Sequence, residues 1–286
     1  MKRFATIFLG LVLLALPTTV IAQISFTFTT IDVPRSTLNR PHGINDSGDI
    51  VGLYRDKGNV GHGYLLRKGH YTRIDVVGAS FTSARDINNS EVIVGGWTDQ
   101  SGLIDHGFVD VAGTITSFDV PGATTTDAFG LNDGGDIVGD YIDAEGVQHG
   151  FIMSGTSLRT VDLPDRVANT VTGINNAHVA VGSGTDANGI DTGFRFRQRT
   201  LAQLHFPGAT STDADGVNDN GVIVGYYLDA SGVTHGFIRT STTWQTVDFP
   251  GASSTLALGL NNADDIVGEY YDSNGVQHGF LAVPVP

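Results

Sequence analysis

Gly259 to Gly268, with the sequence Gly-Leu-Asn-Asn-Ala-Asp-Asp-Ile-Val-Gly, is the last of six copies of one ten-residue phrase. The earlier copies begin at Gly43, Asp86, Gly130, Gly173 and Gly216, so neighbouring copies start 43 or 44 residues apart. A fixed period of this length is typical of repeat architectures, in which every repeat forms one supersecondary unit. The phrase therefore decides the fold class before any other feature of the chain is considered.

Each repeat contains four short apolar or alternating runs separated by turn residues, which is the pattern of four β-strands. The turns are rich in Asn, Asp and Gly, which accept the positive φ values of tight turns. Four strands in a period of about 43 residues predict the blade of a β-propeller, whose sheets stand radially around a central channel. In the fifth repeat we expect strands at Ala214–Asn218, Val222–Leu228, Val233–Thr240 and Trp244–Phe249.

Both ends of the chain carry strands that complete this plan. Phe26–Pro34 resembles a fourth strand with no repeat before it, and the chain stops after Gln277–Val283, a third strand with no fourth. We therefore expect an all-β fold, a single six-bladed β-propeller of four-stranded blades over residues 23–286, with the last blade closed by the N-terminal strand. The alternative, an open β-solenoid, would leave strands without partners at both ends.

The first 22 residues read as a secretory signal peptide. Lys2 and Arg3 precede an apolar run from Ile7 to Leu16, and Val20-Ile21-Ala22 forms a small-residue cleavage site. The apolar run is well short of the roughly 20 residues that a membrane-spanning helix needs. We expect a secreted or periplasmic protein that is not inserted in a membrane.

The composition narrows the possible partners. The chain has 38 glycines and no cysteine, which suits many tight turns and excludes stabilisation by disulfides. Its formal net charge is -14, and loss of the two basic residues of the signal would leave -16. Nucleic acid and anionic membranes are therefore disfavoured as partners. A closed propeller offers no open sheet edge, and we expect a monomer.

A second recurring element follows each phrase. The combination Gly-Ile-Asn-Asp-Ser-Gly-Asp-Ile-Val-Gly, then His-Gly-aromatic, then Asp-Val-Pro-Gly-Ala resembles the HAF repeat of extracellular bacterial repeat proteins, and it covers nearly all of the chain after the signal. The resemblance implies export and repetition, and it implies no activity. Glycine replaces the middle alanine of the His-Ala-Phe signature at Gly63, Gly107, Gly150, Gly236 and Gly279.

Five repeats carry a histidine at the same position, which suggests a metal site at first sight. Each histidine is expected on the third strand of a different blade, roughly 10 Å from the innermost strand at a strand spacing of about 4.8 Å. They cannot converge on one ion at a bond length of about 2.0 Å. The five residues are His62, His106, His149, His235 and His278.

The same repeats place an acid and an aromatic residue at fixed distances from the histidine. We predict that the three side chains touch across three adjacent strands, the carboxylate orienting the imidazole and the ring covering it. The fourth repeat loses all three together, with Gly184, Thr192 and His205. The expected acids are Asp75, Asp119, Asp162, Asp248 and, from the N-terminal strand, Asp32; the expected aromatics are Tyr54, Trp97, Tyr141, Tyr227 and Tyr270.

Few motifs indicate a cofactor or a reaction. Asn45–Asp49 and Asn132–Asp136 offer several oxygens and make calcium conceivable, but the corresponding turns of other repeats lack the same set, and Asx turns explain them better. No nucleophile elbow, zinc motif, phosphate loop or dinucleotide fingerprint is present. We assign no catalytic residue, no metal ligand and no cofactor.

Functional residues are expected where the repeats differ, because repeated positions support the scaffold. The positions three and one residues before each phrase vary strongly, and loops at one end of the propeller surround the channel mouth, where ligands enter. Cations of the first two repeats should face carboxylates of the third and fifth. The channel-mouth binding candidates are Arg40, His42, Arg85, Asp127, Phe129, Asp213 and Asp215.

Two classes of function fit these residues. A binding scaffold for a glycan, a peptide or a cell-surface polymer needs only hydroxyls, acids and an aromatic platform at the mouth, and we favour it. A polysaccharide lyase or glycoside hydrolase would need a base or a carboxylate pair. The candidates are His42 with Arg40 and Arg85, or the pair Asp127 and Asp213. A purely structural surface protein would have no pocket.

Overall fold

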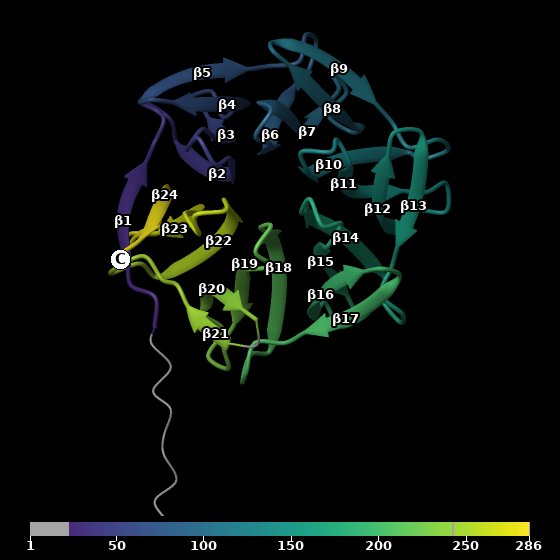
Figure 1. Ribbon diagram of the computed structural model, residues 1–286. Coiled ribbons are helices and arrows are strands. Elements are labelled where there is room, and N and C mark those ends of the chain that lie inside the picture. Colours follow the sequence, from purple (N-terminus) through teal and green to yellow (C-terminus); the bar gives the residue numbers. More distant parts are fainter. Residues whose placement is uncertain (1–22, 242, 286) are drawn as a thin grey trace, which may run out of the picture.

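The fold is a six-bladed β-propeller, as a computed structural model describes it for residues 23–241 and 243–285. Figure 1 shows the blades arranged radially around a central channel. All the described secondary structure is β, in 24 strands. The expected signal peptide, residues 1–22, lies outside the described residues. Within the part of the chain that is described, no helix is long and apolar enough to cross a membrane.

Each of the first five repeats forms one antiparallel blade, numbered here in chain order. Blade 1 contains β2 (Leu38–Ile44), β3 (Ile50–Arg55), β4 (Gly61–Arg67) and β5 (His70–Ile74), and blade 2 contains β6 (Phe81–Ile87), β7 (Val92–Thr98), β8 (Asp105–Val111) and β9 (Thr114–Phe118). Blade 3 contains β10 (Thr125–Leu131), β11 (Ile137–Ile142), β12 (Gln148–Ser154) and β13 (Ser157–Val161). Blade 4 contains β14 (Ala168–Ile174), β15 (Ala180–Thr185), β16 (Asp191–Arg197) and β17 (Thr200–Leu204). Blade 5 contains β18 (Ser211–Val217), β19 (Ile223–Leu228), β20 (Thr234–Thr240) and β21 (Thr243–Thr246).

The sixth blade joins the two ends of the described chain. It contains β22 (Ser254–Leu260), β23 (Ile266–Tyr271) and β24 (Gln277–Pro284), and its outermost strand is β1 (Phe26–Ile31). β1 pairs antiparallel with β24, with Phe28 opposite Ala282. Figure 1 shows β1 beside β24. The predicted closure by the N-terminal strand is confirmed, and the open solenoid is excluded.

The innermost strands begin earlier, and the outer strands end earlier, than the sequence pattern suggested. In blade 5, β18 starts at Ser211 instead of Ala214, and β21 ends at Thr246 instead of Phe249. A side chain near the start of the innermost strand accepts a backbone N–H from a residue two or three positions beyond the end of the preceding outer strand, as Thr255 accepts from Phe249 at 3.0 Å. The residues that accept in this way are Asn39, Thr82, Thr126, Asn169, Thr212 and Thr255.

The core lies between neighbouring blades. At the glycine in the middle of each second strand, an added Cβ would lie within 2.3 Å of a backbone carbonyl oxygen of the first strand. In five of the six blades it would also lie within 3.0 Å of a fully buried aromatic side chain of the third strand, so the three strands fit only because this residue has no Cβ. The outermost strands are largely exposed. The buried aromatics are Tyr64, Phe108, Phe151, Phe194, Phe237 and Phe280.

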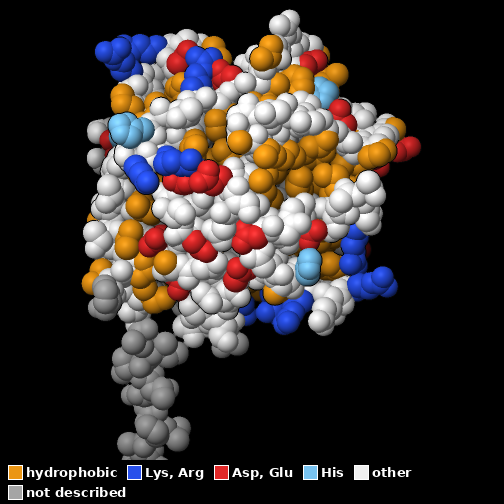
Figure 2. All heavy atoms as spheres, turned by 45° about the horizontal axis from the view of Figure 1, so that its top comes forward, with side chains coloured by type: hydrophobic (Ala, Val, Ile, Leu, Met, Phe, Trp, Pro, Cys, Tyr) orange, Lys and Arg blue, Asp and Glu red, His pale blue; other side chains and the backbone are white. Residues whose placement is uncertain are grey.

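On the face shown in Figure 2, acidic side chains are scattered and basic ones gather in a few separate groups.

The predicted contacts of histidine, acid and aromatic residue are confirmed in all five blades. Each histidine Nδ1 donates to its carboxylate at 2.7 to 3.0 Å, and its ring lies 4.4 to 5.2 Å from the aromatic ring of the neighbouring strand. The acids follow the last residue of the fourth strand instead of lying within it. In blade 4, Arg166 occupies the corresponding space, with its Nη2 donating to Thr192 at 2.9 Å.

These histidines hold the outer strands of the blades in place. At the closing blade, Asp32 accepts from His278 Nδ1 at 2.7 Å and from the backbone N–H of Gly279 at 3.2 Å. At His149, burial lowers the pKa, but hydrogen bonds to Asp162 and Asp143 outweigh it and raise the pKa overall. In each cluster, the hydrogen bond between histidine and carboxylate therefore links the third strand to the residue that follows the fourth strand.

Replacing Asp32 by asparagine should lower the free energy of unfolding by about 1 to 2 kcal/mol, because a charge-assisted hydrogen bond is replaced by a neutral one at the closing strand. Thermal unfolding followed by circular dichroism measures the effect. Thr27→Ala, on the exposed side of the same strand, is the control. A melting temperature equal to that of the wild type would show that the contact between Asp32 and His278 does not stabilise the closure.

Candidate functional site

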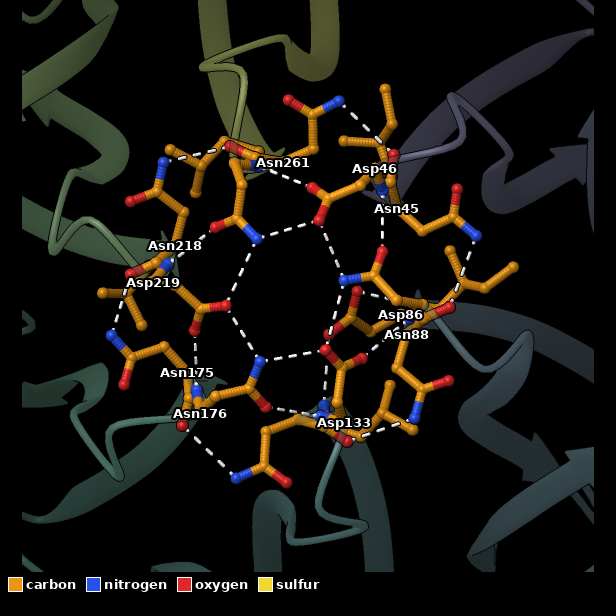
Figure 3. A pocket seen from close by; sticks show the side chains of 18 of the residues that line it. Asn45, Asp46, Asp86, Asn88, Asp133, Asn175, Asn176, Asn218, Asp219 and Asn261 are labelled. Carbon is orange, nitrogen blue, oxygen red and sulfur yellow. Dashed lines mark hydrogen bonds between the residues drawn. The ribbon is translucent and has the colours of Figure 1, made fainter.

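The central channel is bounded at one end by a closed ring of asparagine side chains, seen end-on in Figure 3. The first asparagine of each phrase donates through Nδ2 to the backbone carbonyl of its counterpart in the next blade, over distances of 2.8 to 3.3 Å. The ring closes from blade 6 to blade 1 through the bond from Asn261 to Asn45. The members are Asn45, Asn88, Asn132, Asn175, Asn218 and Asn261.

The next residue of each phrase forms a second ring, in which aspartate and asparagine alternate. Each asparagine donates through Nδ2 to the Oδ2 atoms of both neighbouring aspartates at 2.9 to 3.2 Å. Each backbone N–H donates to the Oδ1 atom of the next residue in the ring at 2.8 to 2.9 Å. Strict alternation gives every carboxylate two amide donors. The members are Asp46, Asn89, Asp133, Asn176, Asp219 and Asn262.

The turns that were considered for calcium are Asx turns. Asn45 Oδ1 accepts from the backbone N–H groups of Ser47 and Asp49, each at 3.0 Å. The Asp49 carboxylate is paired with Arg67 at 2.8 Å. Among the described residues, no group of three or more histidine and acidic side chains is placed to hold a metal ion.

The ring should lose stability in acid. Burial raises the pKa of Asp133, but the hydrogen bonds from Asn176 and Asn89 outweigh it, so the pKa lies below its ordinary value. A lowered folded-state pKa contributes stability above the unfolded value of about 3.9, and this contribution is lost as the pH falls through the folded value. The free-energy difference between wild type and Asp133→Asn, less than about 1 kcal/mol for an exposed carboxylate, should therefore shrink below about pH 4. Urea unfolding at several pH values tests it, and a difference that grows in acid would contradict it.

The neck of the channel is formed by side chains that sit on β-bulges. In every innermost strand the pairing with the second strand shifts by one residue just before the phrase, for example between Pro41 and Gly43. A bulge turns the extra residue out of the ladder, and the six extra side chains line the constriction. They are His42, Arg85, Phe129, Thr172, Asp215 and Leu258.

All seven channel-mouth candidates lie on innermost strands, including Asp213, which lies just outside the strand expected at Ala214–Asn218. In blade 5 the innermost strand begins at Ser211, earlier than the alternation of apolar and polar residues indicated, because the bulge interrupts that alternation. The mouth opens above the neck as a cavity of about 320 Å³. Of the seven candidates, Arg40, His42, Arg85, Phe129 and Asp215 line it.

Two residues of the cavity wall lie at a position that the sequence analysis did not consider. Tyr226 and Glu269 reach the mouth from second strands, β19 and β23. The sequence does hold a signal for them, because the residue that follows Ile-Val-Gly varies as strongly as the candidates do. It also stands directly opposite the candidate three residues before the phrase, as Tyr226 stands opposite Asp213. The six residues at this position are Leu53, Gly96, Asp140, Ser183, Tyr226 and Glu269.

The positive charge of Arg40 is neutralised within the protein. Its Nε and Nη2 atoms bond both carboxylate oxygens of Glu269, at 3.0 Å for Nη2, and Glu269 is 1 % exposed. Gln277 also donates to this carboxylate. Arg40 thus pairs with blade 6, and the expectation that it faces carboxylates of the third and fifth repeats was incorrect.

Arg85 is the cation available at the mouth. Its guanidinium lies 4.8 Å from the centroid of the Phe129 ring and 3.7 Å from Asp127 Oδ2. Its Nη1 lies 3.4 Å from His42 Nε2. Burial, then Arg85 and Arg40, hold the pKa of His42 well below its usual range. His42 is therefore neutral, accepts from Arg85, and donates through Nδ1 to the Ala84 carbonyl at 3.0 Å.

The three acidic candidates have different surroundings. Burial raises the pKa of Asp127 to about 6 and of Asp213 to about 7. Burial, and then Asp213 and Glu269, also raise the pKa of Asp215, whose buried Oδ2 atom has no hydrogen-bond partner among the described residues. Asp127 and Asp213 do not line the mouth cavity, so the structure does not bring them together there.

Comparison with known proteins supports the fold. No protein-family model matches the chain. No curated protein matches it. AofleA from Arthrobotrys oligospora is similar in structure, with a TM-score of 0.58 and 8% identity over 92% of this chain and 90% of that chain. The fucose-specific lectin from Aleuria aurantia has a TM-score of 0.54 and 12% identity over 90% and 98% of the chains.

A propeller from an archaeal protease is similar to the same extent. The β-propeller domain of the Trilobed protease from Pyrococcus furiosus has a TM-score of 0.55 and 10% identity, over 87% of this chain and 79% of that chain. At such low identities the similarity shows a shared propeller architecture.

Proposed function

We propose that this protein is an exported propeller that binds a glycan at the channel mouth. The observation that carries the proposal is the buried Asp215 Oδ2, an acceptor without a partner among the described residues, on a residue that lines the mouth cavity. A buried polar group left unpaired costs about 1 to 3 kcal/mol. A ligand hydroxyl that donates to this oxygen would recover that free energy.

The rest of the cavity suits a neutral ligand with apolar and polar sides. Its volume of about 320 Å³ is at the small end of the range for ligand sites, roughly 300 to 1,000 Å³. The ring of Phe129 and the side chains of Leu256 and Leu258 supply apolar wall, and Tyr226 supplies a hydroxyl. Because Arg40 is paired and His42 is neutral, the mouth has few free charges for an ionic ligand.

The comparisons are compatible with this class of ligand. The Aleuria aurantia propeller is described as a fucose-specific lectin, so a chain of this architecture serves as a glycan-binding scaffold in at least one protein. Membership of the HAF-repeat family and export by the signal of residues 1–22 are parts of the same proposal. Arg85, Asp127, Asp213 and Arg40 are proposed to shape the mouth and its surroundings.

A glycan array probed with the secreted domain, residues 23–286, tests the proposal. We expect binding to a limited set of glycans, and at least a tenfold loss of affinity in two variants. Asp215→Asn replaces an acceptor oxygen by an NH₂ donor, and Phe129→Ala removes the aromatic wall. Asp165→Asn, on an exposed turn, is the control. An array without any bound glycan would contradict the proposal, and hydrolysis of a bound oligosaccharide would favour the glycoside hydrolase alternative.

A further inference from the structure

A second cavity lies over blade 2, beside the channel mouth. It has a volume of about 440 Å³ and is bounded by the ends of β6 and β7, by the end of β3 in blade 1 and by Asp127 of blade 3. Arg85 lines both this cavity and the mouth, so the two cavities are neighbours separated by its side chain. The channel neck contributes no other residue to the second cavity.

Gly96 allows a carboxylate of blade 3 to reach the side of this cavity. It occupies the variable position after Ile-Val-Gly, where every other repeat has a side chain. A Cβ at Gly96 would lie 1.8 Å from Asp127 Oδ1, so the glycine lets the carboxylate of the next blade reach over β7. The loop of blade 2 also has one extra residue, Leu103, which is 80 % exposed next to the cavity-lining Gly102.

The residues that line this cavity carry an unusual share of the unpaired buried polar groups. Across the described residues, eight buried side-chain nitrogen or oxygen atoms have no hydrogen-bond partner, and four of them belong to residues that line this cavity. Buried polar groups are normally paired, so their concentration at one place indicates a partner from outside the chain. The four atoms are Ser83 Oγ, Arg85 Nε, Trp97 Nε1 and Asp127 Oδ1.

The chemistry of the wall selects the class of ligand. Two of the unpaired atoms, on Arg85 and Trp97, can only donate, Asp127 Oδ1 accepts, and the Ser83 hydroxyl does both. The formal charges of the lining residues sum to zero, because two arginines, Arg55 and Arg85, are matched by two aspartates, Asp105 and Asp127. An anion would meet the two carboxylates and a cation the two guanidinium groups. Hydroxyl groups match a wall of mixed donors and acceptors.

We propose that the cavity lined by Ser83, Trp97 and Asp127 is a second binding site, which takes a neutral, hydroxyl-rich group the size of one sugar unit. The site does not depend on the ligand proposed for the channel mouth. Its occupant would sit near Trp97, whose indole stacks on the His106 ring at 4.4 Å and packs against the core cluster that contains Phe108. Binding should therefore change the environment of one identifiable fluorophore.

Tryptophan fluorescence tests the site directly. The chain has two tryptophans, and Trp244→Phe leaves Trp97 as the single reporter. The probes are fucose, galactose and glucose, compared with glucuronic acid and glucosamine as charged sugars. We expect a saturable change with at least one neutral sugar, absent in Trp97→Phe, and at least tenfold weaker binding of its charged relatives. No change up to about 100 mM, where a site with a Kd of about 1 mM would be saturated, or equal binding of charged sugars, would overturn the proposal.

A matched pair of variants separates binding from stability. Asp105 lines the cavity and accepts from Thr98 at 2.6 Å, and Asp191 holds the same position in blade 4 and accepts from Thr185 at 2.5 Å. Asp105→Ala should weaken sugar binding at least tenfold, while Asp191→Ala should lower the melting temperature similarly and leave the dissociation constant unchanged. Equal dissociation constants for the two variants would contradict the site.

The two proposals fail separately. Trp97 does not line the mouth cavity. If sugars leave the Trp97 fluorescence unchanged while glycan binding depends on Asp215, only the second site is overturned. If a sugar changes the Trp97 fluorescence saturably while Asp215→Asn leaves glycan binding unaffected, only the mouth site is overturned.

Discussion

Gly139→Ala is expected to lower the free energy of unfolding by about 3 kcal/mol, the upper part of the range for overpacking a core. An added Cβ would lie 1.9 Å from the backbone carbonyl oxygen of Asp127 and 2.7 Å from the buried Phe151 ring. Neither neighbour can give way, because the first is backbone and the second is fully buried between blades. Urea unfolding monitored by circular dichroism measures the change.

The control is a glycine whose neighbour can move. At Gly58, a Cβ would meet only the carboxylate of Asp56, at 3.2 Å, in an exposed turn. Gly58→Ala should therefore change the free energy of unfolding by no more than about 0.5 kcal/mol. Similar stabilities for the two alanine variants would mean that the close packing of the second strand against the first and third strands does not determine the stability of the blade.

Phe28→Ala should be nearly as damaging, because it weakens the strand that closes the propeller. Its ring packs 5.5 Å from the ring of Phe249 and 5.8 Å from that of Phe280, so it joins β1 to two other elements of the core. We expect a loss of about 2 to 4 kcal/mol, below the full range for a buried phenylalanine because this residue is only partly buried. A weakened β1 also exposes the edge of β24 to intermolecular pairing.

Two measurements check the closure. Thermal unfolding gives the loss of stability, and size-exclusion chromatography at rising concentration shows whether the variant self-associates. Thr27→Ala, a neighbouring exposed position, should behave like the wild type in both. A Phe28→Ala protein that is as stable and as monomeric as the wild type would show that closure does not depend on this side chain.

Much of the fold could be predicted because its contacts are local within one repeat. Tyr54 and His62 are paired on neighbouring strands eight residues apart, and His62 reaches Asp75 thirteen residues later. Such spacings recur in five repeats, so the pairing can be inferred by comparing the repeats. The same logic extended to Asp32 and His278, since the missing fourth strand of the last repeat identified the partner.

The candidate site could be predicted only in part. Residues at the variable positions of the innermost strands were predicted to surround the channel mouth, and His42, Arg85 and Asp215 do line it. The start of the innermost strand was placed too late in blade 5, since a β-bulge breaks the alternation that marks a strand. Tyr226 and Glu269 were overlooked because they belong to a different strand, although their position also varies between repeats.

By itself, the sequence determined the number of blades, their strand order and the strand that closes them, because each follows from a spacing repeated along the chain. The tertiary structure alone decided which side chains meet in the channel. Asn262 bonds Asp46 across 216 residues, and Arg40 bonds Glu269 across 229. Such contacts exist only when the blades are bent into a circle, and the radius and the bulges that set their geometry depend on packing between blades, which no interval in the sequence records.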